Sequence, residues 1–223
     1  IQYDITPDVM VYASYGQGSK AGGFVGAIST TTQAQFLIEP ESSETWEAGI
    51  KLASLDRRLQ LNMAAFRSTF SNLQVSSWDA SVPPGQFQYG NAGKARSQGV
   101  EADGSFEVTR GITLNASVAY LDGKYLDFLG AVCPYNLAGC VPATFNAAGY
   151  PLTRSPKWSG TIGFNAEIPI SDAINFITSG NMSFRSFNYL EESYNPVMGQ
   201  DAYQKYDLRA GIRSSDRRWE IAI

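Results

Sequence analysis

The chain has 223 residues, 43% of them hydrophobic, and its 17 basic and 21 acidic residues give a formal net charge of -4. This acidic balance, without a basic stripe, argues against a nucleic-acid-binding protein. Histidine is absent, which removes Ser–His and Cys–His catalysis and the commonest metal ligand. We therefore expect no enzyme, no metal site and no cofactor.

Nine segments of the chain alternate between apolar and polar residues and are expected to form β-strands. Successive side chains of a strand point to opposite faces, so each segment has one apolar and one polar face. Leu114 and Ala116, for example, alternate with Thr113 and Asn115. The pattern slips near Ala65–Phe66, where we expect a bulge or a change of face. The expected strands are 9–15, 43–53, 58–75, 95–107, 111–122, 156–168, 173–186, 203–213 and 217–223.

The connections between these strands are alternately very short and very long. This rhythm is typical of an antiparallel outer-membrane barrel, which has tight periplasmic turns and long extracellular loops. The short links are expected at 55–58, 109–111, 169–172 and 214–216, and the long loops at 16–42, 76–94, 123–155 and 187–202.

A soluble β-sandwich also has alternating strands, but three observations favour a membrane barrel. The strands approach the length of about 9–11 residues that a tilted strand needs to cross a bilayer. The connections alternate in length, which a sandwich does not require. Aromatic residues lie near strand ends, as in an interfacial girdle: Trp46, Tyr120, Trp158 and Trp219.

The fold class predicted from these patterns is all-β, an antiparallel transmembrane β-barrel. No apolar run is long enough for a transmembrane helix. Nine strands would leave two open edges, whose backbone groups find no partner in hydrocarbon. We therefore expect the chain to be part of a larger barrel.

The two cysteines, Cys133 and Cys140, both fall in the expected loop 123–155. In an oxidising compartment this pair predicts a disulfide that stiffens a long surface loop. Closing so short a loop contributes roughly 2–3 kcal/mol in the chain-entropy model. A metal or redox pair is the alternative, although such sites need a tighter spacing and further ligands.

Four stretches resemble the C-terminal half of the barrel of TonB-dependent outer-membrane receptors. The family's strand that ends in a Gly-rich extracellular loop is similar to 11–24, VYASYGQGSKAGGF. Its Pro-Glu…Glu-x-Gly-x-Lys strand start is similar to 40–51, PESSETWEAGIK. Its Asn-Ala-Gly…Gly-Val-Glu strand resembles 91–103, NAGKARSQGVEAD, and its Pro-led strand after a long loop resembles 152–158, LTRSPKW.

This resemblance implies a fragment of about nine strands from a 22-stranded barrel. Residues 1–223 are then expected to form a partial barrel domain, without the plug domain and the last strand. Family members import scarce, large ligands such as ferric siderophores, cobalamin, haem or oligosaccharides. Their energy comes from the inner-membrane TonB–ExbB–ExbD complex, through a TonB box in the N-terminal part, which is not in this sequence.

Charged residues on several strands share the polar face of their strand. A basic residue on the lipid face costs about 2–4 kcal/mol at mid-membrane, so the polar face is expected to line the lumen. Its charges either pair with one another or with a plug, or form a track for ligand or plug contact. The expected lumen-facing charges are Glu47, Lys51, Glu101, Asp103, Lys157, Glu167, Lys205, Asp207, Arg209 and Arg213.

Ligand selectivity is expected in the long loops, because binding groups concentrate on loops carried by a rigid scaffold. The Gly-rich start of loop 16–42 lacks the spacing and the helix of a phosphate-binding loop. Aromatic residues beside acids in these loops either contact a ligand or pack the loops over the barrel mouth. The acid pair Glu191–Glu192 is expected to be solvated. The candidate ligand-binding residues are Lys20, Phe24, Trp78, Phe87, Tyr89, Tyr189 and Tyr194.

The sequence thus predicts a transport segment in the outer membrane of a Gram-negative bacterium, in contact with outer-membrane lipid. The first hypothesis is TonB-dependent active import of a scarce, large ligand, with a ferric siderophore as the commonest choice in the family. The alternatives are a passive porin-type channel and a surface receptor or adhesin that transports nothing.

Overall fold

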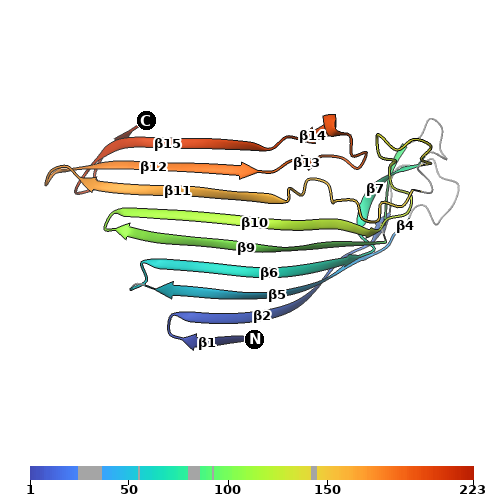
Figure 1. Cartoon of the computed structure of the whole chain (residues 1–223), viewed down its shortest axis with the longest axis horizontal. Helices are drawn as coiled ribbons and strands as arrows, with labels where there is room; N and C mark the ends of the chain where they lie inside the picture. Colours follow the sequence, from blue (N-terminus) through green and yellow to red (C-terminus); the bar gives the residue numbers. More distant parts are fainter. Residues whose placement is uncertain (25–36, 55, 80–85, 92, 142–144) are drawn as a thin grey trace.

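The chain forms one curved antiparallel sheet of ten strands whose spatial order follows their order in the chain. Figure 1 shows the strands side by side, with short turns at one end and the long loops at the other. The computed structural model describes residues 1–24, 37–54, 56–79, 86–91, 93–141 and 145–223. The sheet consists of β1 (Gln2–Thr6), β2 (Val9–Lys20), β5 (Glu41–Ser54), β6 (Leu59–Ser71), β9 (Lys94–Thr109), β10 (Ile112–Asp127), β11 (Trp158–Pro169), β12 (Ile174–Arg185), β15 (Tyr203–Ser214) and β16 (Glu220–Ala222).

Small hairpins lie in the long loops. No helix in the described part of the chain is long and apolar enough to cross a membrane. The elements of the loops are β3 (Gly23–Phe24) with β4 (Leu37–Ile38), β7 (Gln74–Asp79) with β8 (Gln86–Asn91), β13 (Asn188–Tyr189) with β14 (Gly199–Gln200), and the 3-10 helix η3 (Pro196–Met198).

The predicted antiparallel sheet is confirmed, and the structure adds a strand and moves several boundaries. The added strand is β1, whose five residues are all exposed and too few to show a clear period. β2 continues to Lys20 and β10 to Asp127, so both run beyond their predicted ends. β6 ends at Ser71, before Asn72 adopts a positive φ of 54°.

The expected irregularity at Ala65–Phe66 is wrong, because pairing continues through both residues on either side of β6. Phe66 remains on the polar face, opposite Gly99. Its ring lies 3.3 Å from the position that a Cβ of Gly99 would take. The missing side chain of Gly99 therefore makes the space in which an aromatic ring fits on an otherwise polar face.

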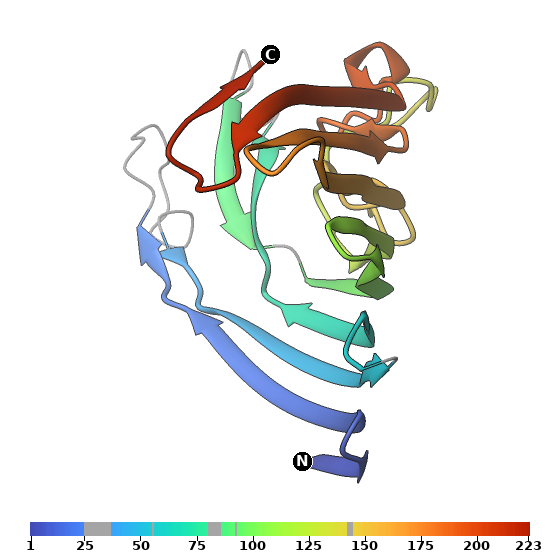
Figure 2. The same cartoon turned by 90° about the vertical axis from the view of Figure 1, so that its left-hand side faces the viewer.

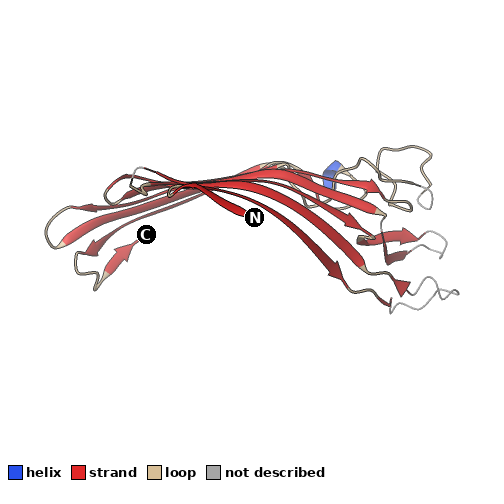
Figure 3. Cartoon of the chain, turned by 90° about the horizontal axis from the view of Figure 1, so that it is seen from below, coloured by secondary structure: helices blue, strands red, loops and turns tan. Residues whose placement is uncertain are grey.

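The two faces of the sheet have the reverse of the usual polarity of a soluble protein. Apolar side chains on one face are open, with Leu114 46%, Ile162 53% and Leu208 75% exposed. Polar residues of the other face, such as Asn115 and Thr161, are partly covered. Figure 2 shows the strands following one another around an arc, and Figure 3 shows the bend of the same wall from below. Within the chain β1 and β16 do not pair, so the sheet is an arc and not a closed ring.

Candidate functional site: the polar wall and the loops at its mouth

Two aromatic pairs mark the level at which the apolar face meets water. Tyr15 and Trp46 have ring centroids 4.5 Å apart, and Tyr120 and Trp158 have centroids 4.9 Å apart. Both pairs lie toward the long-loop ends of their strands, whereas Trp219 lies beside the short turn before β16. Because exposed apolar side chains fill the band between these levels, that face is suited to lipid and the polar face to a wet lumen.

Strand register places the expected lumen-facing charges on one common face. In β5, β9, β11 and β15 these residues alternate with the apolar, exposed ones, and cross-strand pairs such as Asn62 opposite Asp103 join the same face. Lys157 lies just before β11, where its carbonyl accepts the backbone N–H of Leu121 at 2.9 Å, and its place on the lumen side stays a prediction. The residues that share the polar face are Glu47, Lys51, Glu101, Asp103, Glu167, Lys205, Asp207, Arg209 and Arg213.

Several of these groups are held by hydrogen bonds across strands. The Tyr12 hydroxyl donates to Glu47 at 2.7 Å, and the Asn62 amide donates to Asp103 at 2.9 Å. The Lys51 ammonium lies 5.8 Å from the centre of the Tyr12 ring. These contacts fix acidic groups along the polar face of the wall.

A second charge network lies near the short-turn end of the wall. Arg213 bonds to Glu167 at 2.9 Å and to Glu220 at 2.6 Å, and Arg209 also forms an ion pair with Glu220. The sequence pattern indicated Glu167 and Arg209 but not Glu220. That residue comes into place because β16 pairs with β15 in a register that sets Glu220 opposite Arg213.

An apolar cluster covers the inner side of the wall at the long-loop end. Phe70, Ala95 and Tyr125 lie in one cross-strand row on the polar-face side. Phe128 and Ala147, from the following loop, are each 1% exposed and pack against this row. Loop 123–155 therefore folds against the inner face of the wall, which the sequence did not indicate because β10 was expected to end near residue 122.

This loop is also joined to loop 187–202. The Tyr150 and Tyr194 rings have centroids 4.8 Å apart, and the Tyr194 hydroxyl donates to the Pro151 carbonyl at 3.0 Å. The backbone N–H of Arg154 donates to the carbonyl of Tyr189 at 2.7 Å. The two loops thus form one packed unit at the mouth of the wall.

Glu192 lies within this unit. The Tyr125 hydroxyl donates to its carboxylate at 3.0 Å. Burial raises the pKa of Glu192 above its ordinary value, and the hydrogen bond from Tyr125 opposes this shift. Burial and the nearby carboxylate also raise the pKa of Tyr194. The expectation of a solvated acid pair therefore holds for Glu191, which is exposed, but not for Glu192.

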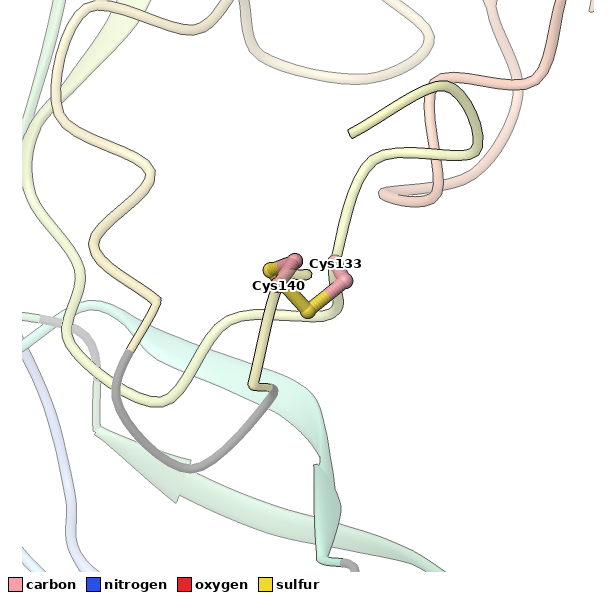
Figure 4. The surroundings of a disulfide bond; sticks show 2 residues. All are labelled: Cys133 and Cys140. Carbon is pink, nitrogen blue, oxygen red and sulfur yellow. A yellow bond between two sulfur atoms is a disulfide. The ribbon is translucent and has the colours of Figure 1, made fainter. Parts of the chain in front are cut away.

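Cys133 and Cys140 form a disulfide in the same loop, with their Cα atoms 5.8 Å apart (Figure 4). The bond closes a segment of the chain just after Phe128 and Ala131, which belong to the apolar cluster. Among the described residues, no three His, Cys, Asp or Glu side chains come together as a metal site.

The seven candidate ligand-binding residues lie in different settings. Lys20 and Phe24 are exposed at the long-loop end of β2 and in β3, with Phe24 81% exposed. Tyr189 is half-buried and packs edge-on against Phe187, while Tyr194 is only 7% exposed. The side chains of the other three, Trp78, Phe87 and Tyr89, lie outside the described part of the structure.

Comparison with known proteins gives a consistent set of relatives. Over 124 residues the chain is 33% identical to the metal-pseudopaline receptor CntO of Pseudomonas aeruginosa, covering 56% of this chain and 16% of that protein. Over 128 residues it is 30% identical to the probable TonB-dependent siderophore receptor PiuA of Acinetobacter baumannii, with the same coverage of both chains. The chain thus spans about a sixth of the curated relatives that it matches.

A solved structure and a family model extend the match to the whole chain. The ferric yersiniabactin uptake receptor FyuA of Yersinia pestis superposes with a TM-score of 0.74 and 17% identity, over 99% of this chain and 30% of that one. The family model described as TonB dependent receptor-like, beta-barrel, matches residues 1–223. The chain therefore belongs to the TonB-dependent receptor β-barrel family, whose members are receptors and transporters of the outer membrane and not enzymes.

Proposed function

We propose that this chain forms lumen wall and extracellular loops of an outer-membrane importer that takes up a metal chelate, with a ferric siderophore as the ligand. The proposal includes energy input from the TonB–ExbB–ExbD complex through a part of the protein outside this sequence. Support comes from the relatives, one named a metal-pseudopaline receptor and another a probable siderophore receptor.

The observation that carries the proposal is the arrangement at the mouth. Loops 123–155 and 187–202 pack on the inner face through Tyr125, Phe128 and Tyr150. Below them the wall presents fixed polar and charged groups such as Glu47 and Asp103. Loops that cover the inner wall are suited to ligand capture and controlled passage, and they disfavour a wide passive pore.

Within this proposal the exposed loop residues supply ligand contacts. Phe24 offers an aromatic surface and Lys20 a positive charge, both near the long-loop end of β2. Trp78 of β7 and Phe87 and Tyr89 of β8 are proposed to contribute further contacts. Tyr189 is proposed to bind at the edge of the aromatic cluster, and the buried Tyr194 to hold that cluster in place.

The test is uptake of radiolabelled iron–siderophore complexes by a deletion strain that carries the full-length gene. The proposal expects uptake that stops when an uncoupler collapses the proton-motive force. Uptake that persists with the uncoupler indicates a passive channel. Wild-type uptake of every candidate chelate by the deletion strain itself would indicate a surface receptor with no transport role.

A further inference from the structure

The base of the β7–β8 hairpin has one amide face and one apolar face. Gln74 lies directly opposite Asn91, so these two side chains are neighbours on the same face. Leu73 and Val75 flank Gln74 in the chain and pack against the apolar cluster of loop 123–155. Because alternate side chains of a strand point to opposite faces, the apolar pair and the amide pair are on different sides. We call Leu73, Gln74, Val75 and Asn91 the hairpin base.

The amide face of the hairpin base holds loop 16–42 at both of its limbs. The side-chain oxygen of Asn91 accepts the backbone N–H of Glu39 at 2.9 Å, and its amide nitrogen donates to the Glu39 carbonyl at 3.0 Å. Asn91 thus pairs with Glu39 as the backbone of a neighbouring strand would. The Gln74 amide donates to the same carbonyl at 3.2 Å and to the Ala21 carbonyl, on the outgoing limb, at 3.0 Å. Gln74 therefore joins the two limbs of the loop.

The two limbs come close together just beyond these bonds. Gly23 pairs with Ile38 where β3 and β4 meet, and a Cβ at Gly22 would overlap the carbonyl oxygen of Ile38. Figure 1 shows β4 and β7 at the long-loop end of the sheet. This neck carries Phe24, which is 81% exposed and is one of the candidate ligand contacts. The amide face therefore sets the position from which Phe24 extends.

The hairpin base is closed by its own hydrogen bonds and contacts a second loop on its other side. The Asn91 amide also donates to the Asn72 carbonyl at 2.7 Å, and the backbone N–H of Asn72 donates to the Gly93 carbonyl at 3.0 Å. The apolar face packs against a cluster in which Phe128 of loop 123–155 is 1% exposed. A shift of the hairpin base therefore separates apolar contacts on one side or amide hydrogen bonds on the other.

We propose that the hairpin base couples loop 16–42 to loop 123–155, so that each loop is held more firmly when the other is in place. The coupling is reciprocal, because a linked equilibrium shifts equally from either side. Hydrogen bonds transmit it on the amide face, and apolar burial transmits it on the other face. In the proposed importer, contact of a ligand with Phe24 then also stabilises the docked loops at the mouth. The coupling itself does not depend on import, and its test uses no ligand.

The experiment measures hydrogen exchange in the full-length receptor, reconstituted in lipid nanodiscs. Gln74→Met keeps the length of the side chain and removes the amide donor to both limbs. We expect exchange within 37–41 to become at least about fivefold faster, as the loss of two hydrogen bonds predicts. Exchange within 128–131 should also become faster, by at least about twofold, because residues in one contact network change together.

Phe128→Ala tests the coupling from the opposite side, because it removes a side chain of the apolar cluster. This variant should speed exchange within 37–41 in the wild-type background. It should have no such effect in the Gln74→Met background, where the connection is already lost. Val75→Ala, which removes part of the same apolar contact, should give the same pattern with smaller changes.

Gln17→Met is the matched control, because the Gln17 amide donates to the Tyr15 hydroxyl at 2.7 Å on the same strand. No change is expected in either segment for this control. A Gln74→Met variant that changes exchange within 37–41 alone would overturn the proposal, since the two loops then move independently. The same holds if Phe128→Ala leaves 37–41 unchanged. An effect of Phe128→Ala that persists in the Gln74→Met background would also overturn it, because the connection then runs through another part of the protein.

Discussion

At the scale of single residues, the wall has little spare volume where Phe66 lies beside Gly99. A Cβ at Gly99 would come within 2.1 Å of the Tyr120 carbonyl oxygen on the neighbouring strand. Because that atom belongs to the backbone, a side chain at this position must displace β10 or β9. The absence of a side chain at Gly99 therefore allows β9 and β10 to pair closely and leaves space for the Phe66 ring.

Gly99→Ala is expected to destabilise the barrel by about 1–3 kcal/mol, the usual cost of forcing extra atoms into a packed site. Gly16→Ala is the matched control, since a Cβ at Gly16 has nothing within 4 Å. Urea unfolding of the refolded full-length receptor measures both variants. Equal stability of the two variants would contradict this account of Gly99.

Glu192 gives the docked loops a dependence on pH. Because burial raises its pKa above the ordinary 4.5, the docked state binds the proton more tightly than the undocked state. Docking is therefore strongest below about pH 4.5 and weakens as the pH rises through the raised pKa. Glu192→Gln removes this dependence and should keep loop 187–202 protected at neutral pH.

Hydrogen exchange of loop 187–202, compared between wild type and Glu192→Gln from about pH 4 to about pH 8, measures this effect. The two proteins should agree at the acidic end and diverge at the alkaline end, with faster exchange in the wild type. A ratio of exchange rates that stays constant across the range would show that Glu192 does not control docking. Glu191→Gln serves as the control, because Glu191 is exposed.

At the scale of elements, loop 123–155 combines an apolar cluster with a disulfide. The cluster holds Phe128 and Ala147 of the loop against Tyr125 of β10, and the Cys133–Cys140 bond shortens the free segment that follows. A closed short loop has less conformational entropy to lose on docking. The disulfide is thus expected to stabilise the loop and not the sheet.

Replacing both cysteines by serine is expected to reduce the stability of the docked loop by roughly 2–3 kcal/mol in the chain-entropy model. Hydrogen exchange should become faster within 128–141, while β9 and β10 keep their protection below the loop. Unchanged exchange in the loop would contradict a stabilising role. Loss of protection throughout the sheet would show that the bond supports the whole wall.

The elements of the wall could be predicted from the sequence because their alternation and their turns are local signals. The extension of β10 through Asp122 and Lys124 could not be predicted, because two charges beside Gly123 are also typical of a loop. This segment is a strand because it pairs with Arg96 and Gln98 of β9. The shared face of the expected lumen charges could be predicted, because alternate residues of a strand lie on the same face. The loop cluster and the pairing of Glu220 depend on contacts between distant segments, which no local pattern contains.

At the scale of the whole molecule, the sheet has its apolar side chains on the open face and its polar hydrogen bonds on the concave wall. This polarity requires lipid on one side and a wet interior on the other. It explains how a chain with 43% hydrophobic residues forms a wall without a buried core between its strands. The loops and the polar face both take their positions from this one arrangement.

The measurement that tests this arrangement most directly is lipid quenching along β10. Single cysteines at 114, 116 and 118, and at 115 and 117, are labelled with a fluorophore in the full-length receptor and reconstituted with brominated lipid. Strong quenching at Leu114, Ala116 and Val118 and little at Asn115 and Ser117 is the predicted result. Uniform quenching, or quenching of the opposite set, would contradict the assignment of the apolar face to the membrane.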